Sequence, residues 1–188
     1  MRGSAFKGDV ALDQSTLAGA TIAPGATGTC SFGAGAPAYT ARGVVAGVDV
    51  QRVGHEFNIP AIATNRYNSA VGGTFDMMGS GGGSYPLTLE VTGTMIDSLL
   101  FGASFPRMDI TTHLSDGNVQ VRTAGTFAGL DPAVVTGNEK AGGRLTGSID
   151  ANTTIRGYAV GVTVDSVDTS GHVELQPSTI GRLMIDHA

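Results

Sequence analysis

The most constraining feature of the sequence is an alternation of apolar and polar residues that extends over residues 86–127. Apolar side chains occupy every second position in successive runs, and Asp116-Gly117 separates the last two runs. A period of two is typical of strands with one buried and one exposed face. Asp-Gly between two such runs indicates a tight hairpin, because its turn needs positive φ angles. The stretch therefore predicts an antiparallel β meander.

Shorter alternating segments surround this meander. They predict a strand, a turn and a strand over residues 9–22, and further strands over residues 27–32, 39–45, 69–77, 142–155, 158–165, 167–176 and 180–186. We interpret the glycine-rich residues 79–84 as a long hairpin loop, because alternating strands flank it, although the segment also resembles an artificial flexible linker.

Two short helices are expected between the strands. Residues 48–54 predict one or two helical turns that end at Gly54. The second helix has Asp131 as its N-cap, Pro132 at its first position and Gly137 beyond its end. The prediction is an all-β fold, an elongated and strongly curved antiparallel sheet of about a dozen strands with one or two short helices.

Composition supports a β domain and excludes several functions. The 188 residues include 29 glycines and no tryptophan, and only 14% are charged, against roughly 25% in an average domain. A hydrophobic content of 41% is enough for a core. The net charge of −5 and the scattered basic residues argue against nucleic acid as a partner. Cys30 is the single cysteine, so no intrachain disulfide forms, and no apolar run approaches the ~20 residues that span a bilayer.

The sequence repeats at intervals of roughly 80 residues, which predicts one domain with repeats over residues 5–85 and 86–165 and a partial repeat over 166–188. One element, with a serine between two glycines, occurs over residues 8–19, 93–102 and 171–181. A second occurs over 43–49 and 125–131, and a third over 73–76 and 147–150. Such units bury their faces against their neighbours, and the recurring glycines mark sharp bends. Residues 1–4 have the composition of an expression leader, and we expect the chain to be an excerpt of a longer protein.

No catalytic or metal-binding motif is complete. His55-Glu56 lacks the second histidine of a zinc helix, and the acidic residues lack the loop of a calcium site. The recurring serines are not part of a Gly-x-Ser-x-Gly nucleophile elbow, so we expect them to form turn hydrogen bonds. The glycine-rich residues 79–83 lack the Lys-Ser/Thr pair of a phosphate-binding loop. We expect neither an enzyme nor a cofactor or metal. His113 faces opposite to Thr112 and Leu114 on its strand, so we expect it on the solvated outer face. The other residues weighed for these chemistries are Asp9, Asp13, Ser15, Ser98, Asp165, Asp168, Ser178 and the isolated His172 and His187.

The amino-acid sequence of nearly the whole chain resembles the AsmA/TamB family, which includes the translocation and assembly module and the bridge-like lipid-transfer proteins. The segments that carry the resemblance are residues 53–60, 73–76, 89–94, 97–102, 125–127, 130–132 and 175–181. The resemblance implies a β-taco, a half-pipe with an apolar concave groove. It also implies a periplasmic segment of a protein anchored in the inner membrane, whose anchor and C-terminal domain are absent from this chain.

The family's roles give the expected function. The resemblance implies that the groove carries phospholipid acyl chains, or shields strands of outer-membrane proteins, between the inner and outer membranes. An outer-membrane assembly protein is then a partner of the full-length protein, in outer-membrane biogenesis and protein secretion. Exposed sheet edges allow homo-oligomers.

A lipid groove requires an apolar face on strand after strand, since each buried methylene gains roughly 0.8 kcal/mol. The residues that meet this requirement are Leu87, Leu89, Val91, Met108, Ile110, Leu114, Val119, Val121 and Phe127. The same alternation is compatible with the closed core of a sandwich or barrel, as in a purely structural β repeat of an adhesin or surface fibre. A third reading, an enzyme on a β scaffold, predicts a polar cleft with clustered acid and base groups.

Overall fold

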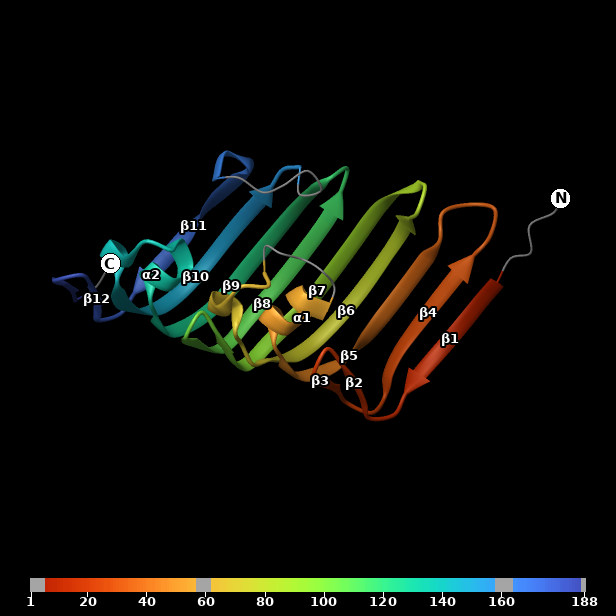
Figure 1. Cartoon of the computed structure of the whole chain (residues 1–188), viewed down its shortest axis with the longest axis horizontal. Helices are drawn as coiled ribbons and strands as arrows, with labels where there is room; N and C mark the ends of the chain where they lie inside the picture. Colours follow the sequence, from red (N-terminus) through yellow and green to blue (C-terminus); the bar gives the residue numbers. More distant parts are fainter. Residues whose placement is uncertain (1–5, 57–61, 158–163, 187–188) are drawn as a thin grey trace.

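The protein forms one open, curved antiparallel sheet (Figure 1). This computed structural model describes residues 6–56, 62–157 and 164–186. Neighbouring strands in the sheet follow the order β1-β4-β5-β6-β7-β8-β9-β10, and β11 pairs with β10. The main strands are β1 (Phe6–Leu12), β4 (Ala26–Phe32), β5 (Ala38–Val48), β6 (Val71–Gly82), β7 (Tyr85–Leu100), β8 (Ala103–Ser115), β9 (Asn118–Leu130), β10 (Gly143–Ile155) and β11 (Val167–Leu175).

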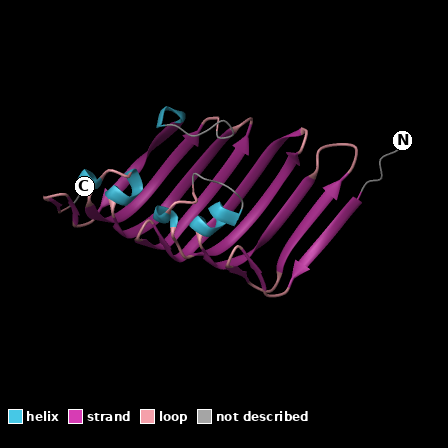
Figure 2. Ribbon diagram, in the orientation of Figure 1, coloured by secondary structure: helices cyan, strands magenta, loops and turns pink. Residues whose placement is uncertain are grey.

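Two short hairpins join the sheet, one through pairing with β5 and one through pairing with β10. They are formed by β2 (Ser15–Leu17) with β3 (Ala20–Ile22) and by β12 (Ser178–Ile180) with β13 (Leu183–Ile185). The predicted all-β class and curved, elongated sheet are therefore confirmed. Most helical segments lie along the lower edge of the sheet, at the ends of the strands that they connect, and one lies at the upper edge (Figure 2).

The helix predicted after Asp131 is confirmed in detail. The Asp131 side chain accepts a hydrogen bond from the Ala133 N–H at 2.9 Å, Pro132 begins α2 (Pro132–Thr136), and Gly137 ends it with a φ of 71°. The earlier helix, α1 (Val50–Glu56), also exists, but Gly54 does not end it. A Cβ at position 54 would lie 2.6 Å from the backbone N of Ala63, so this glycine, within the helix, lets α1 pack closely against the backbone of residues 62–63. Single 3₁₀ turns are η1 (Asn65–Tyr67), η2 (Glu139–Ala141) and η3 (Val164–Ser166).

The predicted hairpin at Asp116-Gly117 is confirmed, with positive φ values of 50° and 73° and with Ser115 paired to Asn118. The glycine-rich segment 79–84 is not the long loop that we expected. β6 continues to Gly82, which pairs with Tyr85, so only two residues form the turn. Glycine has a low strand propensity, but pairing with β5 and β7 on both sides holds this segment extended. The strand predicted over 158–165 is also wrong where it can be compared, because 164–166 is a 3₁₀ turn; residues 158–163 lie outside the described residues.

The repeat seen in the sequence is a repeat of structure. The elements over 43–49 and 125–131 both end a strand at a register shift and lead into α1 and α2. Ser15, Ser98 and Ser178 each begin a hairpin with a two-residue turn, and each lies opposite a bulky residue, Ile22, Phe105 or Ile185. The serine elements therefore mark equivalent places in the sheet.

Two of the three recurring serines, Ser98 and Ser178, join their strands to a neighbouring strand of the sheet. The Gly72 N–H donates to Ser98 Oγ at 3.0 Å, and this hydroxyl lies 3.0 Å from the carbonyl oxygens of both Gly72 and Ile96. Ser178 Oγ accepts from the Thr146 N–H at 3.1 Å and lies 2.7 Å from the Gln176 carbonyl oxygen. Both serines are buried. They supply hydrogen bonds where the ladder is interrupted, a larger role than bonds within a turn.

The two serines Ser98 and Ser15 provide a matched stability test. Ser98→Ala should lower the free energy of unfolding by about 1–3 kcal/mol, because it removes a fully buried hydroxyl on which the half-buried Gly72 backbone groups depend. Ser15→Ala should change it by less than about 0.5 kcal/mol, because the half-buried Ser15 hydroxyl has the nearby Asp13 carbonyl, two residues away, as its described partner. Urea denaturation followed by circular dichroism measures both values, and equal losses would contradict the assigned role of Ser98.

Candidate functional site

The sheet has two chemically different faces because its register keeps side chains of one parity aligned across strands. Phe75, Gly93, Ile110, Thr123 and Ala151 lie opposite one another from β6 to β10. The adjacent row runs through Met77, Val91, Thr112, Val121 and Thr153. Neighbours across a pleated sheet project to the same side.

We call the side that carries these rows the apolar face. Glycine and threonine are the polar or small residues that interrupt it, and the described strand pairs place no charged side chain on it. It continues onto the outer strands through Phe6, Val10, Leu12, Ala26, Cys30, Phe32, Tyr39, Ala41 and Val45 at one side, and Ile149, Ile155, Val167, Val173 and Leu175 at the other.

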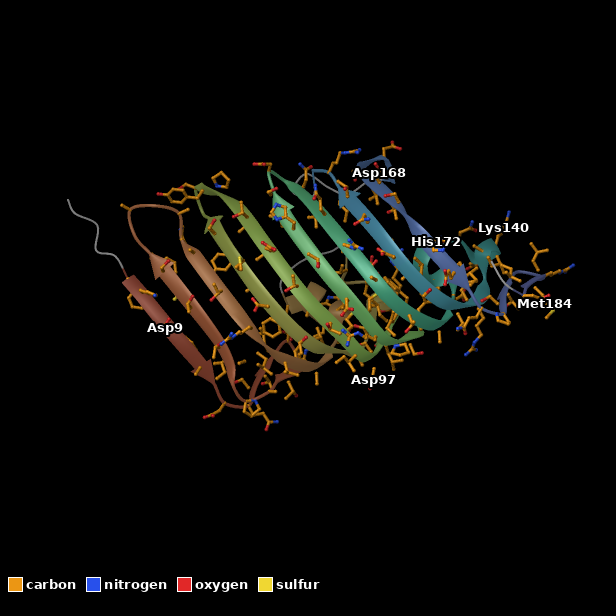
Figure 3. All side chains as sticks on the ribbon, turned by 180° about the vertical axis from the view of Figure 1, so that it is seen from behind. Asp9, Asp97, Lys140, Asp168, His172 and Met184 are labelled. Carbon is orange, nitrogen blue, oxygen red and sulfur yellow. The ribbon has the colours of Figure 1, made fainter. Side chains whose placement is uncertain are left out.

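The opposite side, the polar face, carries the charged strand residues. Figure 3 views it from behind the orientation of Figure 1, with Asp9, Asp168 and His172 labelled. Arg122 pairs with Asp150 at 3.1 Å and Arg107 with Asp109 at 2.9 Å, and these side chains are more than half exposed. Exposed pairs contribute about 0–1 kcal/mol each, so their main effect is to keep this face in water.

Within the part of the chain that the structure describes, no second layer of sheet lies against the apolar face. The apolar residues that are buried are Ala18, Ala20, Ala26, Ala103, Met108, Phe127 and Ala151, and most of these are alanines. Most other residues of the face, such as Val91 and Val121, are half-buried. The described residues therefore contain an open apolar surface rather than the core of a sandwich or barrel.

The apolar face is hollowed near the hairpin end of β7 and β8. The cavity measures about 340 Å³, which is at the small end of the range for ligand pockets. Met95, Met108 and Ile110 form its floor, and Leu100 and Phe101 from the hairpin join them, so the hairpin bends over this face. Its remaining lining residues are Phe105, Thr123, Phe127, Leu130, Leu145, Ile149 and Val173.

Helical segments lie on the same side as this cavity. The rings of Tyr67 in η1 and Phe101 at the hairpin tip are 5.3 Å apart. Figure 1 shows α1 and α2 in front of the sheet, near the ends of the strands from which they emerge. Both helices border the apolar face, and α1 and α2 themselves cover only part of its length (Figure 1).

The structure places the nine predicted groove residues on the apolar face. Met108, Ile110 and Phe127 line the cavity. Leu89, Leu114 and Val119 form one row across β7, β8 and β9, and Val91 and Val121 belong to the next row. Leu87 has the same strand parity as Leu89 but is more exposed. The six residues outside the cavity continue its surface along the strands.

Sequence reasoning missed other parts of the cavity lining. Met95 and Ile149 continue alternations that are visible in the sequence, so a longer reading of β7 and β10 finds them. Leu100 and Phe101 lie in and beside a hairpin turn, and Leu130 and Leu145 flank a register shift, so period-two counting does not assign them to a face. Their place depends on how the strand ends bend.

The residues weighed for other chemistries are dispersed. His55 and Glu56 end α1, where Glu56 pairs with Arg52 at 2.8 Å. His113 lies on the polar face between Glu90 and Gln120, as its parity predicted. Across the described ranges no group of three or more His, Cys, Asp or Glu side chains is arranged to hold a metal ion. His187 lies outside the described residues.

The polar face has two shallow hollows of its own, of about 620 and 610 Å³. The first is lined by polar side chains such as Arg42, Asp76 and Asp109, and the second includes Ser148 and Glu174. Both lie over paired strands and remain open to water. They contain no described nucleophile paired with a base.

Comparisons of the chain with protein-family models, with curated proteins and with solved structures found no match. Among the residues that the structure describes, no helix has both the length and the apolar character needed to cross a membrane.

Adjacent residues on opposite faces allow a direct test of the cavity. An apolar fluorescent dye such as anilinonaphthalene sulfonate should bind at the cavity of the native protein. Ile110→Asp should reduce its fluorescence at least tenfold, because a carboxylate placed there must stay hydrated.

Thr111→Asp is the matched control for this test. Thr111 is exposed on the polar face, so the dye signal should stay within twofold of the native value. Far-ultraviolet circular dichroism establishes that each variant keeps its β structure. Equal dye loss in two folded variants would contradict binding on the apolar face.

Proposed function

We propose that this chain is a lipid-binding β half-pipe segment, similar to the AsmA/TamB proteins, whose apolar face holds phospholipid acyl chains. The observation that carries the proposal is the uncharged apolar face that continues from β1 to β11 without a second layer. A surface of this extent is unusual on a soluble protein and marks a binding site.

The dimensions of the face suit an acyl chain. Strands lie roughly 4.8 Å apart, so the nine main strands span about 40 Å, which exceeds the roughly 15 Å that the acyl chains of one leaflet occupy in a bilayer. Each methylene that leaves water contributes roughly 0.8 kcal/mol, so ten methylenes on the face supply roughly 8 kcal/mol before ordering costs. Non-directional contacts of this kind accept different acyl chains.

The cavity supplies a deeper site within this surface. Met95 and Met108 lie opposite each other there, and methionine side chains adapt to irregular apolar ligands. Phe101, Phe105 and Phe127 add aromatic surface around them. One acyl chain can enter the cavity while the rest of the lipid follows the exposed rows towards Leu89 and Val119.

The two chemical faces support a role in moving lipid through water. The polar face keeps one side of the sheet hydrated, with Arg122, Asp150 and the other charged residues, while the opposite side shelters acyl chains. In the wider proposal, the segment belongs to a periplasmic protein anchored in the inner membrane, and its groove continues through neighbouring repeats towards the outer membrane. The same apolar face also suits the apolar strands of outer-membrane proteins. An outer-membrane assembly protein would then be the partner of the full-length protein.

Native mass spectrometry of the purified chain tests the proposal. We expect bound phospholipid, identified after organic extraction, and saturable binding of a fluorescent phospholipid by lipid-free protein. Val121→Asp should weaken that binding at least tenfold, because it places a carboxylate in the middle of an apolar row.

Gln120→Asp provides the control next to Val121. Gln120 is exposed on the polar face opposite His113, so its replacement should leave phospholipid binding within twofold. A folded native protein that carries no lipid and does not bind added fluorescent phospholipid would contradict the lipid proposal. A purely structural β repeat would then be the better description.

A further inference from the structure

The strand edge formed by β1 and β2 is the first of three equivalent edges in the chain, and the other two edges are occupied by strands of the sheet. Ser15 of this copy is equivalent to Ser98 and Ser178, because each serine begins a hairpin with a two-residue turn and faces a bulky apolar residue. Equivalent edges should accept equivalent partners.

In the second and third copies, the preceding strand occupies this edge. β6 pairs along β7, and Ala70 and Leu99 exchange backbone hydrogen bonds of 2.9 and 3.0 Å beyond the interruption. β10 pairs with both β11 and β12 in the same way. Between the two paired segments, Ser98 Oγ binds the backbone of Gly72, and Ser178 Oγ binds the backbone of Thr146.

The occupying strands share a sequence that begins at the serine contact. In β6 it is residues 72–76, Gly-Gly-Thr-Phe-Asp, and in β10 it is residues 146–150, Thr-Gly-Ser-Ile-Asp. The first residue of each binds the serine, and the glycine follows it. A Cβ on Gly73 would lie only 1.9 Å from the Thr94 carbonyl oxygen, and one on Gly147 only 2.0 Å from that of Glu174. The edge therefore requires glycine at the second position.

In the first copy, the described residues place no strand on this edge. β1 pairs with β4 and β2 pairs with β3, and both pairings use the other side. Ser15 Oγ donates to the Asp13 carbonyl at 2.8 Å, and its side chain is half-buried, whereas Ser98 is fully buried. Val10 and Leu17 remain exposed beside it.

We propose that the free edge of β1 and β2 binds an extended polypeptide strand that carries the residue-Gly-Thr/Ser-apolar-Asp pattern of β6 and β10. The strand lies antiparallel to β1, as β6 does to β7. The backbone N–H of its first residue donates to Ser15 Oγ, and the carbonyl oxygen of that residue lies beside the same hydroxyl. Its glycine lies against the backbone of Ala11 and Leu12. Its large apolar residue continues the apolar face, and its Asp joins the polar face.

A synthetic peptide tests this edge without any lipid. Fluorescein-labelled peptide with the sequence of residues 143–155 is titrated into the full lipid-free chain, and fluorescence anisotropy is measured. We expect saturable binding. The same peptide with Gly147→Ala should bind at least tenfold more weakly, because its methyl group meets the backbone of the edge.

Variants of the protein locate the peptide. Ser15→Ala should weaken its binding by about tenfold, the effect of losing roughly one hydrogen-bonded contact. Val121→Asp, on the distant apolar face of β9, should leave it unchanged and so separates this site from the lipid site. Amide hydrogen exchange should slow over residues 6–17 on adding peptide, and not over β11.

Three results would overturn the proposal. The first is equal binding of the native and Gly147→Ala peptides. The second is slowed amide hydrogen exchange outside residues 6–17 on adding peptide. The third is self-association of the chain through β1 that the peptide does not displace. The last result, measured by sedimentation, would assign the edge to a second copy of this chain. Phospholipid binding is measured in a separate experiment. A protein that binds no phospholipid can still bind the peptide, and a protein that binds no peptide can still bind phospholipid.

Discussion

The antiparallel backbone ladder is the constraint on which the rest of the structure depends. It aligns residues of one parity over many strands, so an apolar residue in one strand meets apolar, glycine or threonine residues in the next. A one-residue slip would move every side chain of a strand to the other face. The buried apolar core is small, so the ladder and its alternation hold the fold together more than packing between layers does.

The repeated serines and glycines resolve a conflict within that ladder. A curved sheet must bend its strands, and each bend interrupts backbone pairing. Ser98 and Ser178 restore hydrogen bonds at two bends, while Gly73 and Gly147 let the neighbouring backbone approach beside them. The hairpin that follows Ser98 bends over the apolar face, so the same device that preserves pairing also shapes the cavity.

An open single-layer sheet leaves two kinds of unsatisfied surface, and each has its own chemistry. The apolar face lacks contacts for its side chains, which any flexible apolar molecule can supply. On the β1 edge no described strand pairs with the backbone, and the Ser15 hydroxyl donates to the Asp13 carbonyl of its own turn, so an added extended strand can pair with both. The face and the edge therefore select different partners, and the proposed lipid and strand sites do not compete for the same atoms.

The sequence alone determined the strand class, the face to which Leu89 and Val121 belong, the Asp116-Gly117 hairpin and the capped helix at Asp131. Each depends on local spacing or on the backbone preference of one residue. Tertiary structure decided that the sheet stays open, because the alternation is the same in an open sheet and in a closed sandwich. It also decided that residues 79–82 are strand and that Leu100 and Phe101 line the cavity, because pairing with distant strands and the bend of a hairpin are not recorded in local sequence.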